Sequence, residues 1–158
     1  MRIPRIYLET SVFNFVFADD APDKKQDTVR LFEEILRGKY EPYTSEYVVN
    51  ELSDAPKEKR IKMLRLISDY GVSLISASDE AVWLAGMYVA EGIIPEKYSA
   101  DALHIAAASI ADMSFITSWN FKHIVKRKTI LMTEFINARE GYNRIGIHSP
   151  TEVIDHDE

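Results

Sequence analysis

Three acidic residues and one asparagine stand where a binding site of an α/β protein is expected. Glu9 follows the apolar run RIYL, and Asn120 follows the run SFITS. Glu51 lies at the edge of an apolar helical stripe, and Asp101 opens an alanine-rich helix. In open α/β sheets, ligands bind beyond the carboxyl ends of the strands. Converging carboxylates repel one another unless a cation neutralises them, so this pattern predicts a site for Mg²⁺ or Mn²⁺.

Each of these residues also has a purely structural interpretation. Asp101 can stabilise the N-terminus of its helix, an effect of about 0.3–1 kcal/mol. Glu9 can mark the point where its strand reaches solvent, Glu51 can be a solvated helix residue, and Asn120 can cap a turn. The chain contains 25 acidic residues, and some will fall at such positions by coincidence. The spacing alone therefore leaves both interpretations open.

Strand-like and helix-like patterns alternate along the chain and would position these residues. We predict strands at residues 5–9, 40–45, 72–76, 114–118 and 144–148. We predict helices at residues 11–17, 22–39, 45–54, 56–70, 78–92, 99–112 and 120–140. This alternation is typical of parallel strands with helices on both faces. The expected fold is a three-layer α/β/α sandwich with a mainly parallel sheet, formed by residues 1–158 as a single domain.

Two of the predicted helices have apolar faces that we expect to turn inward. Val29, Phe32, Ile35 and Leu36 share one face of the first, and Ile61, Leu64 and Ile67 share one face of the second. Such spacing is typical of amphipathic helices that cover a core. A glycine follows each pattern and is expected to end the helix, at residues 38 and 71.

Composition excludes several classes of protein and site. The formal net charge is -6, which argues against a protein that coats nucleic acid through bulk electrostatics. The chain has no cysteine, so disulfides and thiolate zinc sites are excluded. It has no glycine-rich phosphate loop, which argues against a common nucleotide-binding domain. Neither a signal-peptide pattern nor a span of roughly 20 apolar residues is present, and we expect a cytoplasmic protein without membrane contact.

Four motifs, in the order IYLETSVFNF, TSEYVVNEL, SADALHIAAAS and FITSWNFKHI, resemble the PIN-domain family and particularly its toxin-like VapC branch. The closing segment IGIHSPTEVI also resembles that family, so the resemblance covers essentially the whole chain. It implies an α/β/α sandwich and an Mg²⁺- or Mn²⁺-dependent endoribonuclease. It further implies the toxin component of a type II toxin–antitoxin pair, with RNA as substrate and an antitoxin as partner.

The resemblance also implies roles for individual residues. Glu9, Glu51 and Asp101 match the family's acidic positions and would hold the metal, with Asn120 near the last acidic position as a fourth catalytic residue. Thr10, Ser11 and Thr117 match the adjoining hydroxyls, which would contact substrate phosphate or support the metal ligands. His104, one turn after Asp101, is interpreted as a packing or supporting residue rather than a general base.

Two positions depart from the family's pattern. The first acid is Glu9 rather than aspartate, and its extra methylene moves the carboxylate outward. The last acid is replaced by Asn120, which carries no charge. We therefore expect one well-bound ion, and the alternative function is a PIN-like RNA- or protein-binding module with weakened or lost nuclease activity.

A basic segment and an aromatic segment suggest binding surfaces. The segment after Asn120 contains the RNA-contact candidates Lys122, His123, Lys126, Arg127 and Lys128. The segment VFNFVF contains Phe13, Phe15 and Phe17, more bulk than one face of a short helix can bury. From these phenylalanines we expect a homodimer.

Overall fold

The computed structural model describes residues 2–156 and contains a five-stranded, all-parallel sheet. The strand order is β3-β2-β1-β4-β5. The strands are β1 (Arg5–Leu8), β2 (Glu41–Ser45), β3 (Ser73–Ile75), β4 (Phe115–Thr117) and β5 (Gly146–His148). The first strand in sequence thus lies at the centre of the sheet, and the sequence-predicted α/β class with a parallel sheet is confirmed.

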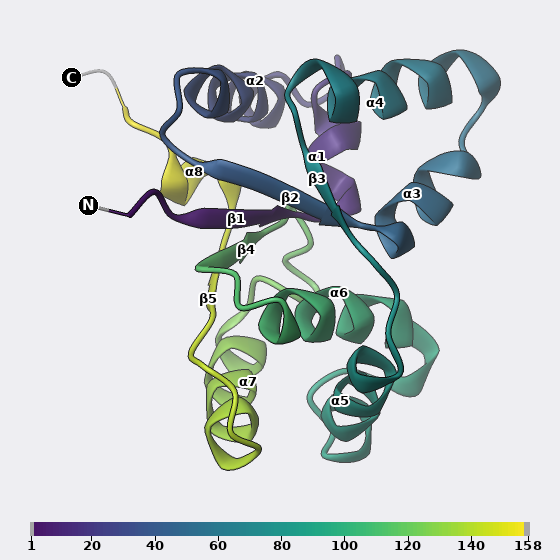
Figure 1. The fold of residues 1–158 in the computed structure, drawn as a ribbon. Helices are drawn as coiled ribbons and strands as arrows, with labels where there is room; N and C mark the ends of the chain where they lie inside the picture. Colours follow the sequence, from purple (N-terminus) through teal and green to yellow (C-terminus); the bar gives the residue numbers. More distant parts are fainter. Residues whose placement is uncertain (1, 157–158) are drawn as a thin grey trace.

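Helices connect successive strands and lie on both faces of the sheet, so the described residues form three layers (Figure 1). The first four are α1 (Thr10–Phe15), α2 (Pro22–Leu36), α3 (Glu46–Ser53) and α4 (Lys57–Asp69). The others are α5 (Asp79–Ala90), α6 (Ser99–Ile110), α7 (Arg127–Arg139) and α8 (Pro150–Val153), with a 3-10 turn η1 (Glu96–Tyr98) before α6. Figure 1 shows α2 and α4 on one side of the sheet and α5, α6 and α7 on the other.

Strand register brings the carboxyl ends of the three central strands together. Tyr7 of β1 pairs with Tyr43 of β2, and Leu8 of β1 pairs with Thr117 of β4. Glu9 continues this ladder, because its N–H donates to the Thr117 carbonyl at 3.1 Å. Parallel strands end at the same edge of a sheet, so the residues just after β1, β2 and β4 are neighbours in space.

The core is most tightly packed around α6. Ala102, Ala106, Ala107 and Ala108 are buried there, together with Ile105. Small side chains let a helix approach its neighbours closely, and α6 contacts α3, α5 and β4. This close packing fixes the buried side chains of α6, including His104.

Three details of the predicted helices are wrong. On α2 the buried residues include Leu31, Phe32 and Ile35, whereas Leu36 is 71% exposed. On α4 Met63 and Leu66 are buried and Ile61 is 49% exposed. In both cases the inward stripe is rotated relative to the predicted one, because neighbouring elements rather than the spacing alone decide which part of a broad apolar stripe is covered. The predicted helix at 120–140 begins only at Arg127, after a series of turns.

The phenylalanines of α1 and of the turn that follows it do not form a large exposed surface. Phe13 is fully buried, and Phe15 and Phe17 are partly buried. Phe13 packs against Phe32 of α2 with ring centroids 6.0 Å apart. The expected surplus of exposed phenylalanine is therefore wrong, since α1 sits between α2 and the sheet edge. Within residues 2–156, no helix combines the length and apolar character needed to cross a membrane.

Candidate metal centre

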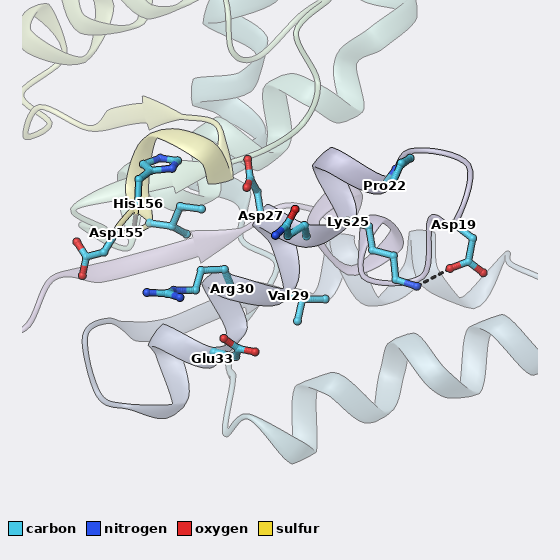
Figure 2. Close-up of a pocket in the computed structure, with 11 residues that line it drawn as sticks. Asp19, Pro22, Lys25, Asp27, Val29, Arg30, Glu33, Asp155 and His156 are labelled. Carbon is cyan, nitrogen blue, oxygen red and sulfur yellow. Dashed lines mark hydrogen bonds and ion pairs between the residues drawn. The ribbon is translucent and has the colours of Figure 1, made fainter. Parts of the chain in front are cut away.

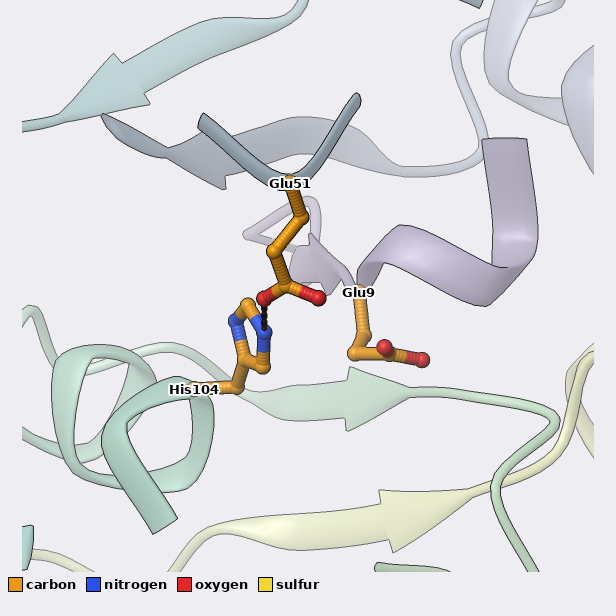
Figure 3. Close-up of side chains that lie close together, drawn as sticks. All are labelled: Glu9, Glu51 and His104. Carbon is orange, nitrogen blue, oxygen red and sulfur yellow. Dashed lines mark hydrogen bonds and ion pairs between the residues drawn. The ribbon is translucent and has the colours of Figure 1, made fainter. Parts of the chain in front are cut away.

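Three side chains from distant parts of the sequence converge at the carboxyl edge of the sheet. Glu9 follows β1, Glu51 lies on α3, and His104 lies on α6. One ligand atom from each lies within 4.8 Å of the corresponding atoms of the other two. Figure 3 shows the Glu51 carboxylate pointing at the His104 imidazole, with a hydrogen bond between them, and the Glu9 side chain beside the pair.

The Glu9 carboxylate is held in place by its own helix and by β4. Its Oε1 accepts hydrogen bonds from the Ser11 N–H at 3.2 Å and the Ser11 hydroxyl at 2.5 Å. The Ser118 hydroxyl donates to the same oxygen at 2.6 Å. Glu9 is only 5% exposed and acts as the N-cap of α1. The longer side chain thus folds back over the start of α1, and the hydrogen bonds within residues 2–156 involve only one of its two oxygens.

Thr-Ser pairs follow or end each of the three central strands. They are Thr10–Ser11 after β1, Thr44–Ser45 at the end of β2, and Thr117–Ser118 at the end of β4. Ser11 also accepts from the Trp119 N–H at 2.8 Å, and Ser118 accepts from the Asn120 N–H at 2.9 Å. Sequence reasoning missed Ser118 and Ser45 as site residues. The recurrence of the same dipeptide at three strand ends is the signal that would have found them.

A buried relay of hydrogen bonds orients His104. Its Nδ1 lies 2.8 Å from the Tyr7 hydroxyl, which lies 2.7 Å from the Ser45 hydroxyl. All three residues are fully buried, and complete burial raises the pKa of Tyr7, so its phenol stays protonated. The other ring nitrogen, Nε2, is hydrogen-bonded to Glu51, whose side chain is 40% exposed. His104 thus links a buried polar chain to the open side of the cluster.

The carboxylates control the charge on the histidine. Burial by itself lowers the pKa of His104, but the hydrogen bond to Glu51 and the negative charge of Glu9 raise it above its ordinary value. The carboxylates thereby favour the protonated, positively charged form of His104. The negative charge of the cluster therefore favours binding of a positive charge, whether that charge is a proton on His104 or a metal ion.

Asp101 lies close enough to the cluster to be affected by it. Burial raises the pKa of Asp101, and the charge of Glu9 raises it further, while His104 and a hydrogen bond with Asn120 act in the opposite direction. The Asn120 Oδ1 accepts from the His123 N–H at 2.9 Å. Because that oxygen is engaged, the amide group presents its NH₂ to the Asp101 carboxylate. Asn120 therefore both caps the turn after β4, as its structural interpretation expects, and stabilises an acid of the site.

The arrangement fits a divalent cation. The buried Glu9 carboxylate, the exposed Glu51 carboxylate and an imidazole are the donor types that Mn²⁺ and related metals accept. Two atoms that bind the same small cation lie at most about 4 Å apart, close to the separation found here. Asp101 adds a further carboxyl group, whose pKa is raised first by burial and then by the charge of Glu9.

Other sequence-predicted residues lie beside the cluster rather than in it. The hydroxyls of Thr10 and Thr117 are buried and have no hydrogen-bond partner within residues 2–156. His123 stacks on Tyr98 with ring centroids 4.1 Å apart, and the Lys122 ammonium lies 5.4 Å from the centroid of the Tyr98 ring. The other basic candidates are exposed at the start of α7, at positions 126, 127 and 128. The basic segment is therefore on the surface next to Asn120.

Trp119 packs beneath the site and does not offer a free face. It is 7% exposed, and its indole N–H donates to the Thr28 hydroxyl at 2.8 Å. Phe15 and Phe121 both pack against it, and the Lys24 ammonium lies 5.7 Å from the centroid of the indole ring. Its role is to support the turn that carries Asn120.

A surface pocket of about 720 Å³ lies between α2 and the C-terminal segment, away from the acidic cluster (Figure 2). Its lining mixes acids such as Asp27 and Asp155 with bases such as Lys25 and Arg30. Lys25 forms an ion pair with Asp19 at one end. This mixture of charges favours no particular class of ligand. The convergence of Glu9, Glu51 and His104, rather than the volume of this pocket, therefore identifies the candidate site.

Comparison with known proteins supports the fold. No protein-family model matches the chain, and no curated protein matches it. Among solved structures, a chain of the VapBC2 complex from Rickettsia felis, crystallised bound to a DNA fragment from their promoter, has a TM-score of 0.54 at 16% sequence identity. The similarity covers 91% of this chain and 97% of that one. At this identity it concerns architecture alone, and the chain has an α/β, PIN-like fold similar to that structure.

Proposed function

We propose that this protein is a divalent-metal-dependent endoribonuclease and the toxin component of a type II toxin–antitoxin pair. The observation that carries the proposal is the convergence of Glu9, Glu51 and His104 within 4.8 Å at the carboxyl edge of a parallel sheet. The similarity to a VapBC2 complex supports a toxin–antitoxin context. We further propose that residues 1–158 act as one domain.

In this proposal the three carboxyl groups have a shared task. Glu9 and Glu51 bind Mg²⁺ or Mn²⁺, and Asp101 completes the negative site at the start of α6. Ser11 and Ser118 orient the Glu9 carboxylate through the hydrogen bonds to its Oε1. The cation, when bound, supplies an activated water nucleophile and offsets negative charge on the phosphoryl oxygens.

The neighbouring polar groups would position the substrate. The Asn120 NH₂ group, which faces Asp101, is a donor suited to a phosphate oxygen. The buried hydroxyls of Thr10 and Thr117 are further candidates, since neither has a partner within the described residues. Lys122, His123, Lys126, Arg127 and Lys128 would contact the flanking RNA backbone. These basic residues beside the acidic site would allow an RNA strand to approach the protein despite its net charge of -6.

Replacing Asp101 with alanine tests the proposal. Asp101→Ala should abolish Mn²⁺-dependent cleavage of single-stranded RNA, because the site loses one of its three carboxyl groups. Its circular dichroism and melting temperature should stay close to those of the parent protein. Asp69→Ala, which removes an exposed acid at the end of α4, is the matched control and should cleave normally. Full cleavage by Asp101→Ala would refute the assignment.

One observation favours the alternative, a binding module without nuclease activity. The Asn120 Oδ1 is engaged by the His123 N–H, so no oxygen of this side chain faces the cation site. A site that has lost its metal should show no change in melting temperature with Mn²⁺. A Mn²⁺-dependent rise that Asp101→Ala weakens would exclude this alternative.

The remaining proposals concern partners. We propose an antitoxin as protein partner and a homodimer as the assembled state. With α1 covered, the surface for self-association must lie elsewhere, and exposed apolar residues occur on α5 and α7 at Val82, Trp83, Leu131 and Phe135. A mass of twice 18.1 kDa in light scattering is expected, and a monomer at micromolar concentration would contradict the dimer.

A further inference from the structure

His104 occupies a position from which it can bind the cation directly. We propose that its Nε2 atom is a nitrogen ligand of the metal centre and that the site consequently prefers Mn²⁺ and similar transition metals to Mg²⁺. This inference rests on the proposed function, because it assigns a further ligand to the same site. It goes beyond a supporting role for His104, and it identifies the class of metal that the site selects.

The buried relay behind His104 allows its Nε2 to carry a lone pair. A neutral imidazole has one N–H and one acceptor nitrogen, and a hydrogen-bond partner decides which is which. Metal-binding histidines almost always donate the N–H of their other nitrogen to an acceptor. The Tyr7 oxygen, 2.8 Å from Nδ1, can be that acceptor. Tyr7 can then send its own hydrogen to the Ser45 hydroxyl, 2.7 Å away, so no buried donor is left unpaired.

When Nδ1 of His104 carries the hydrogen, the Nε2 side of the imidazole requires a cation. Nε2 lies within hydrogen-bonding distance of a Glu51 carboxylate oxygen. When Nδ1 carries the hydrogen, Nε2 and this oxygen are two acceptors facing each other, and they repel. The Glu9 carboxylate is the third acceptor of the group, within 4.8 Å of both. A divalent ion between them satisfies all three lone pairs at once.

Rigidity makes His104 a better ligand than an exposed side chain. It is fully buried on α6, whose alanines pack closely against neighbouring elements. Tyr7 comes from the central strand, so the imidazole is fixed to the sheet as well as to the helix. Glu51, with its side chain 40% exposed, is the least buried member of the group and has room to adjust to the ion.

A nitrogen ligand changes which metal binds best. Mg²⁺ prefers oxygen ligands and loses its waters reluctantly, whereas imidazole suits transition metals. We expect Mn²⁺ to bind at least about tenfold more tightly than Mg²⁺, the size of effect that one metal-site interaction commonly has. His104→Gln removes the imidazole nitrogen but keeps a polar side chain of similar reach. In this variant the ratio of the two dissociation constants should fall toward one.

Pulsed electron paramagnetic resonance on the Mn²⁺-loaded full chain tests the inference without any activity measurement. The parent protein should show electron spin-echo modulation from a directly bound ¹⁴N nucleus, and His104→Gln should lose it. His123→Gln is the control, because His123 is the other histidine near the acids and its Nε2 is buried without a partner in the described residues. That variant should keep the modulation.

The possible outcomes separate this inference from the function on which it rests. Mn²⁺ binding without ¹⁴N modulation in the parent protein would overturn the histidine ligand and leave the carboxylate site standing, and it needs no variant to fold. Loss of the signal in His123→Gln rather than His104→Gln would also overturn it. If Mn²⁺ does not bind at all, seen as an unchanged free-ion signal, both the inference and the proposed metal-dependent function fail.

Discussion

Glu9 illustrates how a single residue type alters a site. Its side chain is one methylene longer than aspartate and folds back to cap α1. From the sequence we expect the extra methylene to move the carboxylate outward. Instead, hydrogen bonds from Ser11 and Ser118 hold one of its oxygens at the start of α1. The orientation of this acid depends on two hydroxyl groups that are 107 residues apart in the sequence.

Removing one of these hydroxyls should weaken the metal site. Ser118→Ala deletes the 2.6 Å hydrogen bond to Glu9. Loss of a group that orients a metal ligand typically reduces metal affinity by about 10–100-fold. We expect a reduction toward the lower end for Mn²⁺ in isothermal titration calorimetry, since Ser11 still holds the carboxylate. Ser68→Ala, at an exposed serine of α4, should bind Mn²⁺ as the parent does, and equal affinities in all three proteins would contradict the role of Ser118.

At the level of elements, the sequence predicts more of the fold than of the site. Strand order cannot be read from periodicity, but Glu9 could be selected because it follows a strand, Asp101 because it begins a helix, and Glu51 because it lies at the edge of an apolar helical stripe. The sequence predicts His104 as a packing or supporting residue near Asp101, but not as a member of the ligand group, because its apolar helix looks like ordinary packing. Its partner Tyr7 sits in mid-strand, where an aromatic residue is expected for packing alone. Only the pairing of distant elements reveals the relay.

A second group of elements is joined by a buried acid. Glu34 of α2 is 3% exposed and accepts from Arg30 at 3.0 Å, Lys39 at 2.7 Å and the Asp155 N–H at 2.9 Å. Burial acts to raise the pKa of Glu34, but these donors prevail and lower it. The carboxylate therefore ties the C-terminal segment to α2 and to the turn before β2.

Glu34 should make stability depend on pH. Its folded-state pKa lies below the unfolded value of about 4.3, so its contribution is complete above that pH and is lost as the pH falls through the lowered pKa. Glu34→Gln should reduce the free energy of unfolding at pH 7 by about 2 kcal/mol, the scale of a hydrogen bond to a charged group. Urea unfolding at pH 7 and at pH 3 should show this difference shrinking in acid.

The adjacent Glu33 provides the control for this pH effect. It is exposed on the same helix, so Glu33→Gln should change the unfolding free energy little at either pH. A Glu34→Gln difference that is the same at pH 7 and pH 3 would contradict the charged role of Glu34.

On the scale of the whole molecule, charge is unevenly distributed. The net charge is -6, yet the exposed basic residues 126, 127 and 128 begin α7 a few positions after Asn120. RNA bound there should release counterions, and affinity for single strands should fall by about 0.7 logarithmic units per contacted phosphate per tenfold increase in salt.

Neutralising this patch should flatten the salt dependence. The triple variant Lys126→Gln, Arg127→Gln and Lys128→Gln should reduce the slope by about 2, for three lost phosphate contacts. Fluorescence anisotropy with a labelled single-stranded RNA at several salt concentrations measures it. The equivalent change on α4, at Lys57, Lys59 and Lys62, should leave the slope unaltered, and an unchanged slope in the first variant would exclude the patch as an RNA contact.

We propose above all that the fold brings Glu9, Glu51 and Asp101 together to hold one divalent cation. Crystals soaked in Mn²⁺ and measured at a wavelength where manganese scatters anomalously would locate the ion. We expect one strong anomalous peak within bonding distance of carboxylate oxygens of Glu9 and Glu51, on the side that faces Asp101. Saturating Mn²⁺ that leaves this position empty, or a peak that none of these carboxylates touches, would contradict it.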